Sequence, residues 1–262
     1  MRPISRSRRA LCPLALVFLF ASACTGRDAV RAPVDGQGRS ERPIVYAAVG
    51  ASETAGVGTD EPFRDAWPRV LWRALPEGSV LYDFGVGGST ARQALEEQAG
   101  AARAVKADLV TVWLNVNDLI EGVPPKRYGH DLRRIVHRLR RGGLTTVLVA
   151  NTPRLDTLPL YMACRSEDHI YVAPSGGVVL CRQDILVDVP TPASVRADVD
   201  AYNAQIDRVV RREGAILVDL YALGDIPNRH PEYVSSDGFH PSTEGARAVA
   251  EAFERALAAA GD

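Results

Sequence analysis

The sequence has no excess of charge of either sign, and cysteines and aromatic residues are scarce. Lysine and arginine number 31 against 32 aspartate and glutamate, so the formal net charge is −1. The lack of a basic excess argues against a dedicated nucleic-acid binder. Four cysteines in 262 residues exclude a disulfide-dense miniprotein. With 46% hydrophobic residues the chain is typical of a globular protein, and its length favours one α/β domain with a single large core.

An apolar run that is too short to span a membrane comfortably stands near the N-terminus. Leu11–Phe20 is almost wholly apolar, arginines precede it, and Ala21-Ser22-Ala23 and Cys24 follow. A basic start, a short apolar run and small residues are typical of an export signal, which we assign to residues 1–23. The residues 21–24 resemble a bacterial lipobox, so we expect Cys24 to be lipidated and the protein to be a lipoprotein of the cell envelope. The alternative is cleavage with release as a soluble secreted protein.

Residues 24–42 contain glycine, proline and charge without apolar periodicity, which predicts a flexible tether before a domain at 43–262. Two cysteines, Cys164 and Cys181, remain in that domain. In an exported protein the favoured interpretation is a disulfide. A metal-binding pair is disfavoured, because the nearby residues lack the spacing of a zinc site.

Strand-like and helix-like segments alternate through the domain. Leu132–Leu139 has helical apolar spacing and is followed by Gly142-Gly143, and Val249–Leu257 has the same spacing after a candidate N-cap, Ser242. The short β-branched or aromatic segments are 43–50, 79–86, 108–115, 145–152 and 215–222. This alternation predicts a three-layer α/β/α domain with a five-stranded parallel sheet.

One segment, residues 153–193, interrupts the alternation. We predict no clear helix in it, and a β-hairpin over 169–181 with its turn at Pro174–Gly177. Ordered connections of this length are commonly functional. The segment follows the fourth predicted strand, so we expect it to lie beside the rim where ligands bind.

Residues with catalytic chemistry follow several of the predicted strands. Ser52 comes after the first, Gly88 after the second and Asn117 after the third, and Asp237 and His240 lie past the fifth. In an open parallel sheet these positions meet at one edge. A serine needs an adjacent base, which His240 supplies, and Asp237 orients that histidine. The N–H groups of Ser52 and Gly88 and the Asn117 amide are candidate donors to an oxyanion, and glycine at 88 lets the backbone approach the reacting centre.

Each of these residues also has an interpretation without catalysis. Ser52 alone is more often a helix N-cap than a nucleophile, and Asn117 is an alternative cap for the helix that follows it. Gly88 is equally explained as a turn glycine. Asp237 and His240 alone suggest no more than a hydrogen-bonded pair in a loop.

Together, the four segments resemble the four blocks of the SGNH (GDSL-type) serine hydrolase family. "GAS" at 50–52 matches the nucleophile block, "DFGVGGST" at 83–90 and "NVND" at 115–118 match the two oxyanion blocks, and "DGFHP" at 237–241 matches the D-x-x-H-P block. The resemblance covers about residues 44–257. It implies a flavodoxin-like fold, catalytic Ser52, Asp237 and His240, and oxyanion donors Ser52, Gly88 and Asn117.

The resemblance implies an esterase, lipase, thioesterase or carbohydrate deacetylase that needs no cofactor or metal. The expected partners are a small-molecule, lipid or glycan ester and, through the anchor, a membrane; we expect a monomer and no nucleic acid. The sequence departs from the family pattern at Ala51, Asp83 and Asn115, which leaves the triad intact. The α/β-hydrolase elbow G-x-S-x-G is absent, since residue 54 is threonine. The alternative function is a catalytically inactive lipoprotein that binds envelope glycan or lipid.

An arginine-rich stretch lies on the helix predicted over 132–139. It is most simply the solvated face of an amphipathic helix, with cations near the helix C-terminus. Contact with anionic lipid headgroups is the alternative for a tethered protein. The arginines are Arg133, Arg134, Arg138, Arg140 and Arg141.

Overall fold

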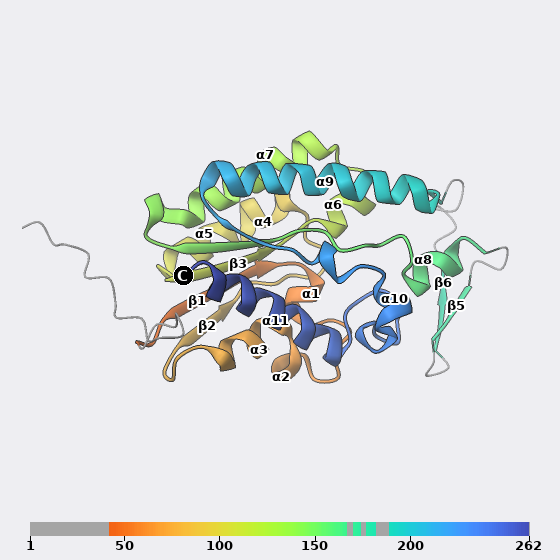
Figure 1. The fold of residues 1–262 in the computed structure, drawn as a ribbon, viewed down its shortest axis with the longest axis horizontal. Helices are drawn as coiled ribbons and strands as arrows, with labels where there is room; N and C mark the ends of the chain where they lie inside the picture. Colours follow the sequence, from red (N-terminus) through yellow and green to blue (C-terminus); the bar gives the residue numbers. More distant parts are fainter. Residues whose placement is uncertain (1–41, 167–169, 174–176, 182–188, 262) are drawn as a thin grey trace, which may run out of the picture. The chain divides into compact units, whose positions relative to one another are not determined.

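The computed structural model describes residues 42–166, 170–173, 177–181 and 189–261. In these residues five parallel strands form one sheet in the order β2-β1-β3-β4-β7 (Figure 1). The five strands predicted from the sequence are confirmed, each somewhat shorter than its predicted segment. They are β1 (Val45–Gly50), β2 (Val80–Asp83), β3 (Leu109–Trp113), β4 (Thr146–Ala150) and β7 (Ile216–Val218).

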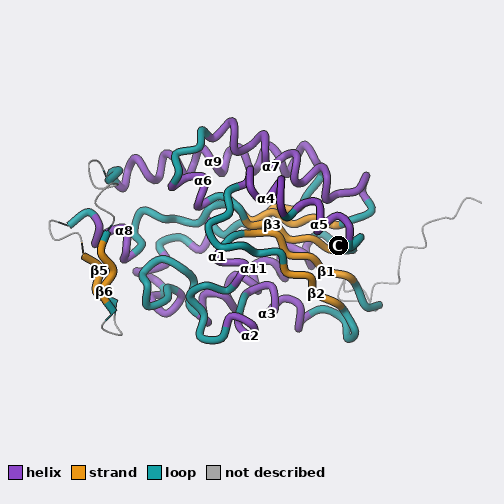
Figure 2. The backbone as a smooth tube through the Cα atoms, turned by 180° about the vertical axis from the view of Figure 1, so that it is seen from behind, coloured by secondary structure: helices purple, strands orange, loops and turns teal. Residues whose placement is uncertain are grey.

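Helices cover both faces of the sheet, so the predicted three-layer α/β/α fold is confirmed (Figures 1 and 2). The helices packed on one face are α4 (Ala91–Glu97), α5 (Ala99–Ala104), α7 (Pro125–Arg140) and α9 (Pro192–Glu213). The other face is covered by α3 (Trp67–Ala74) and α11 (Thr243–Ala259).

The strand β1 shows why the central segments are apolar on both faces. Its alternate residues Ala47 and Val49 belong to the core under one helix layer, and Tyr46 and Ala48 to the core under the other. Successive side chains of a strand point to opposite faces, so a sheet covered on both sides needs apolar residues at every position. The core on the α11 side includes Trp67, whose ring stacks on Phe253 with centroids 4.3 Å apart.

The ends of the two predicted helices follow the sequence prediction. Ser242 caps α11, because its Oγ accepts a hydrogen bond from the backbone N–H of Gly245 at 3.0 Å. The helix α7 ends at Arg140, and the chain then leaves the helical conformation through positive φ angles at Arg141, Gly142 and Gly143. Glycine adopts such angles without the steric cost that a Cβ brings.

Short elements connect the layers, and most lie near the carboxyl ends of the strands. They are the helices α1 (Ser52–Ala55), α2 (Pro62–Asp65), α6 (Val116–Ile120) and α10 (Ile226–Arg229), and the 3₁₀ turns η1 (Arg141–Gly143), η3 (Tyr221–Leu223) and η4 (Pro231–Tyr233). No helix in the described residues is both long and apolar enough to cross a bilayer.

The segment 153–193 differs in part from its prediction. The predicted hairpin is confirmed as β5 (Ile170–Val172) paired antiparallel with β6 (Val178–Leu180). The predicted disulfide between Cys164 and Cys181 is also present. The expectation of no helix is wrong, since α8 (Pro159–Cys164) forms one and α9 begins at Pro192. Proline at the first helical position explains both starts, because its missing N–H is not needed there.

Several sequence predictions lie outside the described residues. These are the export signal at 1–23, the lipidation site Cys24, the tether up to residue 41 and the hairpin turn at 174–176.

Candidate active site

The five predicted site residues are carried by loops and short helices at the carboxyl edge of the sheet. Ser52 opens α1 directly after β1, Gly88 lies in the loop after β2, and Asn117 is in α6 after β3. Asp237 and His240 lie in the loop before α11. Ligands bind at this edge in open α/β sheets.

Ser52, His240 and Asp237 form a hydrogen-bonded chain. His240 Nε2 lies 3.1 Å from Ser52 Oγ, and His240 Nδ1 lies 2.6 Å from Asp237 Oδ2. With the proton on Nδ1 donated to the carboxylate, Nε2 is free to accept the serine proton. The structure therefore contains the arrangement of nucleophile, base and orienting acid that activates a serine.

The Asp237 carboxylate is held by more than the histidine. Its Oδ1 accepts hydrogen bonds from Ser235 Oγ at 2.6 Å, Phe239 N at 2.8 Å and His240 N at 2.9 Å. Partial burial alone would raise the pKa of Asp237, but the hydrogen bonds from His240, Ser235 and the backbone outweigh it and hold the pKa well below its ordinary value. Asp237 is therefore ionised across the physiological pH range. Ser235 was not foreseen from the sequence.

Gly238 connects this turn to the segment 153–193. Its φ is +73°, and a Cβ there would lie 2.6 Å from the Tyr171 ring and 2.9 Å from Leu160 N. The Gly238 carbonyl accepts a hydrogen bond from Leu160 N at 3.0 Å. The absence of a side chain thus lets α8 and β5 pack directly on the turn that carries Asp237 and His240. The expectation that this segment lies beside the site is confirmed.

Close packing determines the turn that presents Ser52. A Cβ on Gly50 would lie 1.9 Å from Thr54 Oγ1, so only glycine fits between β1 and α1. The Gln98 side chain holds the same residue from both sides: its Oε1 accepts from Gly50 N at 3.1 Å, and its Nε2 donates to Gly50 O at 3.0 Å. Gln98 Nε2 also reaches Ser89 Oγ at 3.1 Å. Gln98 therefore joins the serine turn to the loop that carries Gly88.

The interpretation of Ser52 as a helix cap is wrong. The N-cap of α1 is Ala51, and Ser52 is the first helical residue, with its hydroxyl directed to His240. Among the described residues no backbone acceptor takes the Ser52 N–H or the Gly88 N–H. Both N–H groups are therefore available to a ligand oxygen.

The structure explains why glycine stands at 88 and where the Asn117 side chain points, and both explanations differ from the sequence interpretation. Gly88 has φ +81°, but a Cβ there would meet no atom within 4 Å, so the backbone conformation rather than close protein contact requires glycine. The Asn117 side chain does not cap α6, whose N-cap is Asn115. Its Nδ2 donates to Ser89 O at 3.1 Å, which uses one amide hydrogen and leaves the second for another acceptor.

Glu53 places a second carboxyl beside the nucleophile. The residue is 9% exposed, and its Oε2 lies 3.5 Å from Ser52 Oγ. Burial raises the pKa of Glu53, while a backbone hydrogen bond, the His240 charge and the Ser52 hydroxyl oppose the rise. No sequence motif had singled out this residue.

Asp118 links the third block to the second. Its Oδ2 accepts a hydrogen bond from Ala91 N, at the start of α4, at 2.8 Å. Burial raises the pKa of Asp118 to about 6, with the Ala91 hydrogen bond opposing the rise. The carboxyl thus positions the neighbouring Asn117 relative to the loop after β2.

The raised pKa of Asp118 predicts a pH-dependent stability. Between pH 3.8 and about 6 the folded state holds this proton more tightly than the unfolded state, so the parent loses stability as the pH rises through that window. The Asp118→Asn variant has no ionisable side chain at this position, so it does not lose stability in this way. We expect its unfolding free energy, relative to the parent, to rise by up to about 3 kcal/mol between pH 3.5 and pH 7. Urea unfolding at both pH values measures it, and an unchanged difference would contradict the prediction.

An apolar pocket of about 60 Å³ lies against the histidine. Its polar walls are Glu53, the His240 ring and Arg154, whose guanidinium is paired with Asp156. The Trp113 indole also lines it, and its N–H has no hydrogen-bond partner among the described residues. Apolar side chains form most of the remainder, including Leu155, Leu158, Leu220, Leu223, Tyr233 and Phe239.

Within the described part of the chain, no group of three or more His, Cys, Asp and Glu side chains is placed to hold a metal ion.

The family comparison agrees with the geometry of the site. The model of the GDSL-like Lipase/Acylhydrolase family matches residues 48–248, a range that includes Ser52, Asp237 and His240. No curated protein sequence matches the chain.

Solved structures of this fold class resemble the chain over nearly their whole length. The lipase/acylhydrolase from Enterococcus faecalis has 18% identity and a TM-score of 0.58, covering 82% of this chain and 96% of its own. The Clostridium thermocellum family 3 carbohydrate esterase has 18% identity and a TM-score of 0.56, covering 84% and 100%. The acetyl xylan esterase AlAXEase has 16% identity and a TM-score of 0.56, covering 81% and 99%. At these identities the likeness establishes the fold.

Proposed function

The chain belongs to the GDSL-like lipase/acylhydrolase family and is a carboxylic ester hydrolase, and we propose that it cleaves short-chain esters through Ser52, His240 and Asp237. The observation that carries this proposal is the unbroken hydrogen-bonded chain from Ser52 Oγ through His240 to Asp237, with distances of 3.1 and 2.6 Å. A p-nitrophenyl acetate assay on Ser52→Ala and His240→Ala tests it.

In the proposed mechanism Ser52 Oγ attacks the ester carbonyl carbon while His240 Nε2 takes the serine proton. The tetrahedral intermediate collapses, its bond to the alcohol oxygen breaks, and the imidazolium returns the proton to the leaving alcohol. A water molecule, deprotonated by His240, then attacks the acyl carbon, the bond from that carbon to Ser52 Oγ breaks, and the imidazolium returns the proton to Ser52 Oγ, which releases the acid. The Asp237 carboxylate stabilises the imidazolium in both steps.

The proposed oxyanion site consists of the Ser52 N–H, the Gly88 N–H and the Asn117 side-chain amide. Two observations support it: both backbone N–H groups are without a backbone acceptor in the described part of the chain, and the Asn117 amide is held by Ser89 O beside them. Donors that are in position before charge develops stabilise the transition state without reorganising.

The small pocket beside His240 supports a short acyl group. A volume of about 60 Å³ holds roughly four water-sized groups, which suits an acetyl to butyryl chain. Its leucine and aromatic walls favour an apolar occupant over a charged one. We therefore place the acyl group in this pocket and the alcohol on the open side of Ser52.

This assignment predicts a strong dependence on acyl chain length. We expect kcat/KM on p-nitrophenyl esters to be highest between acetate and butyrate and to fall by roughly tenfold or more at octanoate, since one unaccommodated methylene group already costs about tenfold. Leu158 lines the pocket and is 6% exposed. Leu158→Ala should therefore lengthen the preferred chain.

Leu139→Ala serves as the matched control for this series. Leu139 is also buried but belongs to the core under α7, so its truncation destabilises the fold without widening the pocket. A parent that prefers octanoate, or a shift of preference in both leucine variants alike, would contradict the assignment of the acyl site.

We further propose that the enzyme is exported and anchored to a membrane through a lipid on Cys24. The support is the order of basic, apolar and small residues before Cys24. We expect the parent to sediment with membranes. The Cys24→Ser variant should no longer sediment with them, or should keep its uncleaved export signal. A mature protein in the soluble fraction, with an unmodified Cys24 at its N-terminus, would contradict the anchor.

A further inference from the structure

A hollow lined by arginines lies on the face of the domain formed by α5 and α7. It measures about 420 Å³, and its wall consists of Arg103, Arg134, His137, Arg138, Arg141 and Gly142. No acidic residue of the described chain belongs to this wall. Glu213, which accepts from His137 Nδ1, is also paired with Arg133, so its charge is already compensated. The hollow is therefore a concentrated patch of positive charge.

Two of the arginines are fixed in place by neutral groups. Arg138 donates to Leu95 O at 3.1 Å, and Arg141 donates to Ala107 O at 3.3 Å and to Thr145 Oγ1 at 3.4 Å. These bonds order the guanidinium groups without neutralising them. Arg103 and Arg134 are exposed, and neither forms an ion pair with another described residue. Several N–H donors thus remain for an anion, and guanidinium groups match phosphate oxygens in pairs.

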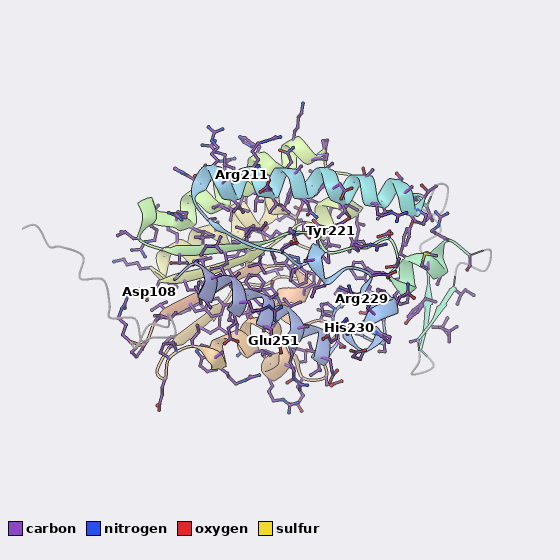
Figure 3. All side chains as sticks on the ribbon, viewed as in Figure 1. Asp108, Arg211, Tyr221, Arg229, His230 and Glu251 are labelled. Atoms are coloured by element: carbon purple, nitrogen blue, oxygen red, sulfur yellow. A yellow bond between two sulfur atoms is a disulfide. The ribbon has the colours of Figure 1, made fainter. Side chains whose placement is uncertain are left out.

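The hollow lies at the edge of the sheet from which the N-terminal segment departs. Arg141 contacts Ala107, and the next residue, Asp108, accepts hydrogen bonds from Val45 N and from the Arg42 guanidinium. Figure 3 shows Asp108 at the left end of the domain, and Figure 1 shows β1 running from that end towards α1 in the middle of the view, with α10 near the opposite end. A flexible linker as long as the segment from Cys24 to Arg42 spans roughly 23 Å on average.

We propose that the arginine hollow binds the phosphates of anionic phospholipid headgroups and docks the domain on the membrane that carries the proposed anchor. Two observations select this partner: the uncompensated positive charge, and the position of the hollow beside the start of the described chain. An anchor on Cys24 keeps this edge close to the bilayer, where each arginine gains from the negative surface potential. The proposal rests on the proposed anchoring and not on the identity of the ester.

Docking at this edge determines whether the active site faces the membrane or the solvent. The strands run from the hollow towards Ser52, so the triad faces away from the bilayer. Esters would then reach Ser52 from the aqueous side rather than from the lipid phase.

Vesicle sedimentation tests the hollow separately from the lipid anchor. The full chain carrying Cys24→Ser is mixed with vesicles of phosphatidylcholine alone or with added phosphatidylglycerol. We expect binding to require phosphatidylglycerol and Arg103→Gln/Arg134→Gln to weaken it roughly 30-fold, which follows from about 1 kcal/mol per arginine at 1.4 kcal/mol per tenfold. Unchanged hydrolysis of a short soluble ester shows that this variant is folded.

Lys126→Gln/Arg127→Gln is the matched control, since it removes the same charge from the exposed opposite end of α7. That end lies beyond the screening length from the hollow, so we expect little change. Equal losses in both double variants, or binding independent of phosphatidylglycerol, would overturn the proposal. The proposal would also be overturned if inorganic phosphate raised the Tm of the parent but not of Arg103→Gln/Arg134→Gln, while both proteins bound vesicles equally. That result would identify a site for a free anion.

Discussion

Replacing Ser52 by alanine is expected to abolish nearly all hydrolysis of p-nitrophenyl acetate, and His240→Ala is expected to do the same. We expect kcat to fall by roughly 10⁴–10⁶ in each, and the double variant to be no worse than either single one, because nucleophile and base act as one unit. The physical reason is the 3.1 Å contact between His240 Nε2 and Ser52 Oγ: without the base the hydroxyl keeps its proton, and without the hydroxyl there is no acyl-enzyme.

The exposed His130, which is paired with Asp131, provides the matched control, and His130→Ala should retain parental turnover. A fluorophosphonate reagent gives an independent readout, because it should label Ser52 in the parent and fail to label the His240 variant. Ser52→Ala enzyme that is purified, folded and still near parental turnover would exclude the acyl-enzyme mechanism. It would also favour the alternative function, in which the fold is retained for binding and not for catalysis.

Asp237→Asn is expected to lower kcat by about 10⁴ while leaving the fold and KM nearly unchanged. Three donors, from Ser235 Oγ, Phe239 N and His240 N, converge on Oδ1, so an asparagine must place its oxygen there. Its NH₂ group then faces His240 Nδ1, at the position that Oδ2 holds at 2.6 Å. That nitrogen must become an acceptor, the ring proton moves to Nε2, and the base is lost.

Ser235→Ala separates this effect from a general loosening of the turn. It removes one of the hydrogen bonds to Oδ1 but leaves Oδ2 facing His240, and we expect less than about a tenfold loss in kcat, because one neutral hydrogen bond contributes about 1 kcal/mol. Thermal unfolding of both variants checks that the turn persists. A kcat for Asp237→Asn within tenfold of the parent, or equal losses in the two variants, would show that Asp237 does not orient the histidine.

Local sequence patterns are sufficient to predict the strands and the blocks that follow them. The segments around β1, β3 and β4 are apolar at successive positions because both faces of the sheet are covered, and a chemistry-bearing residue follows β1 and β3 directly. The long helix α9 was not predicted, although its buried residues recur at helical spacing: Val195, Val199, Tyr202, Ile206 and Val209. The preceding segment, which has no comparable periodicity, obscured its start at Pro192.

The partners that hold the site together could not be predicted in the same way. Gln98 lies 48 residues from Gly50, Asp118 lies 27 residues from Ala91, and no periodicity relates the members of either pair. The glycine at 238 had been recognised only as part of a D-x-x-H-P block. Its structural reason is the approach of Tyr171 and Leu160, which belong to a segment whose direction the sequence does not specify.

For this protein the sequence by itself determined the fold class and the order along the chain in which polar residues follow the strands. It also determined that Ser52, Asp237 and His240 are the candidate catalytic residues. These follow from the pattern of neighbouring residues, which a strand or helix imposes within a few positions. The tertiary structure alone decided that the histidine reaches the serine, that the segment 153–193 packs on the catalytic turn, and that four arginines surround one hollow. Those contacts depend on how whole elements are placed against one another, and that placement is determined by the packing of the complete core.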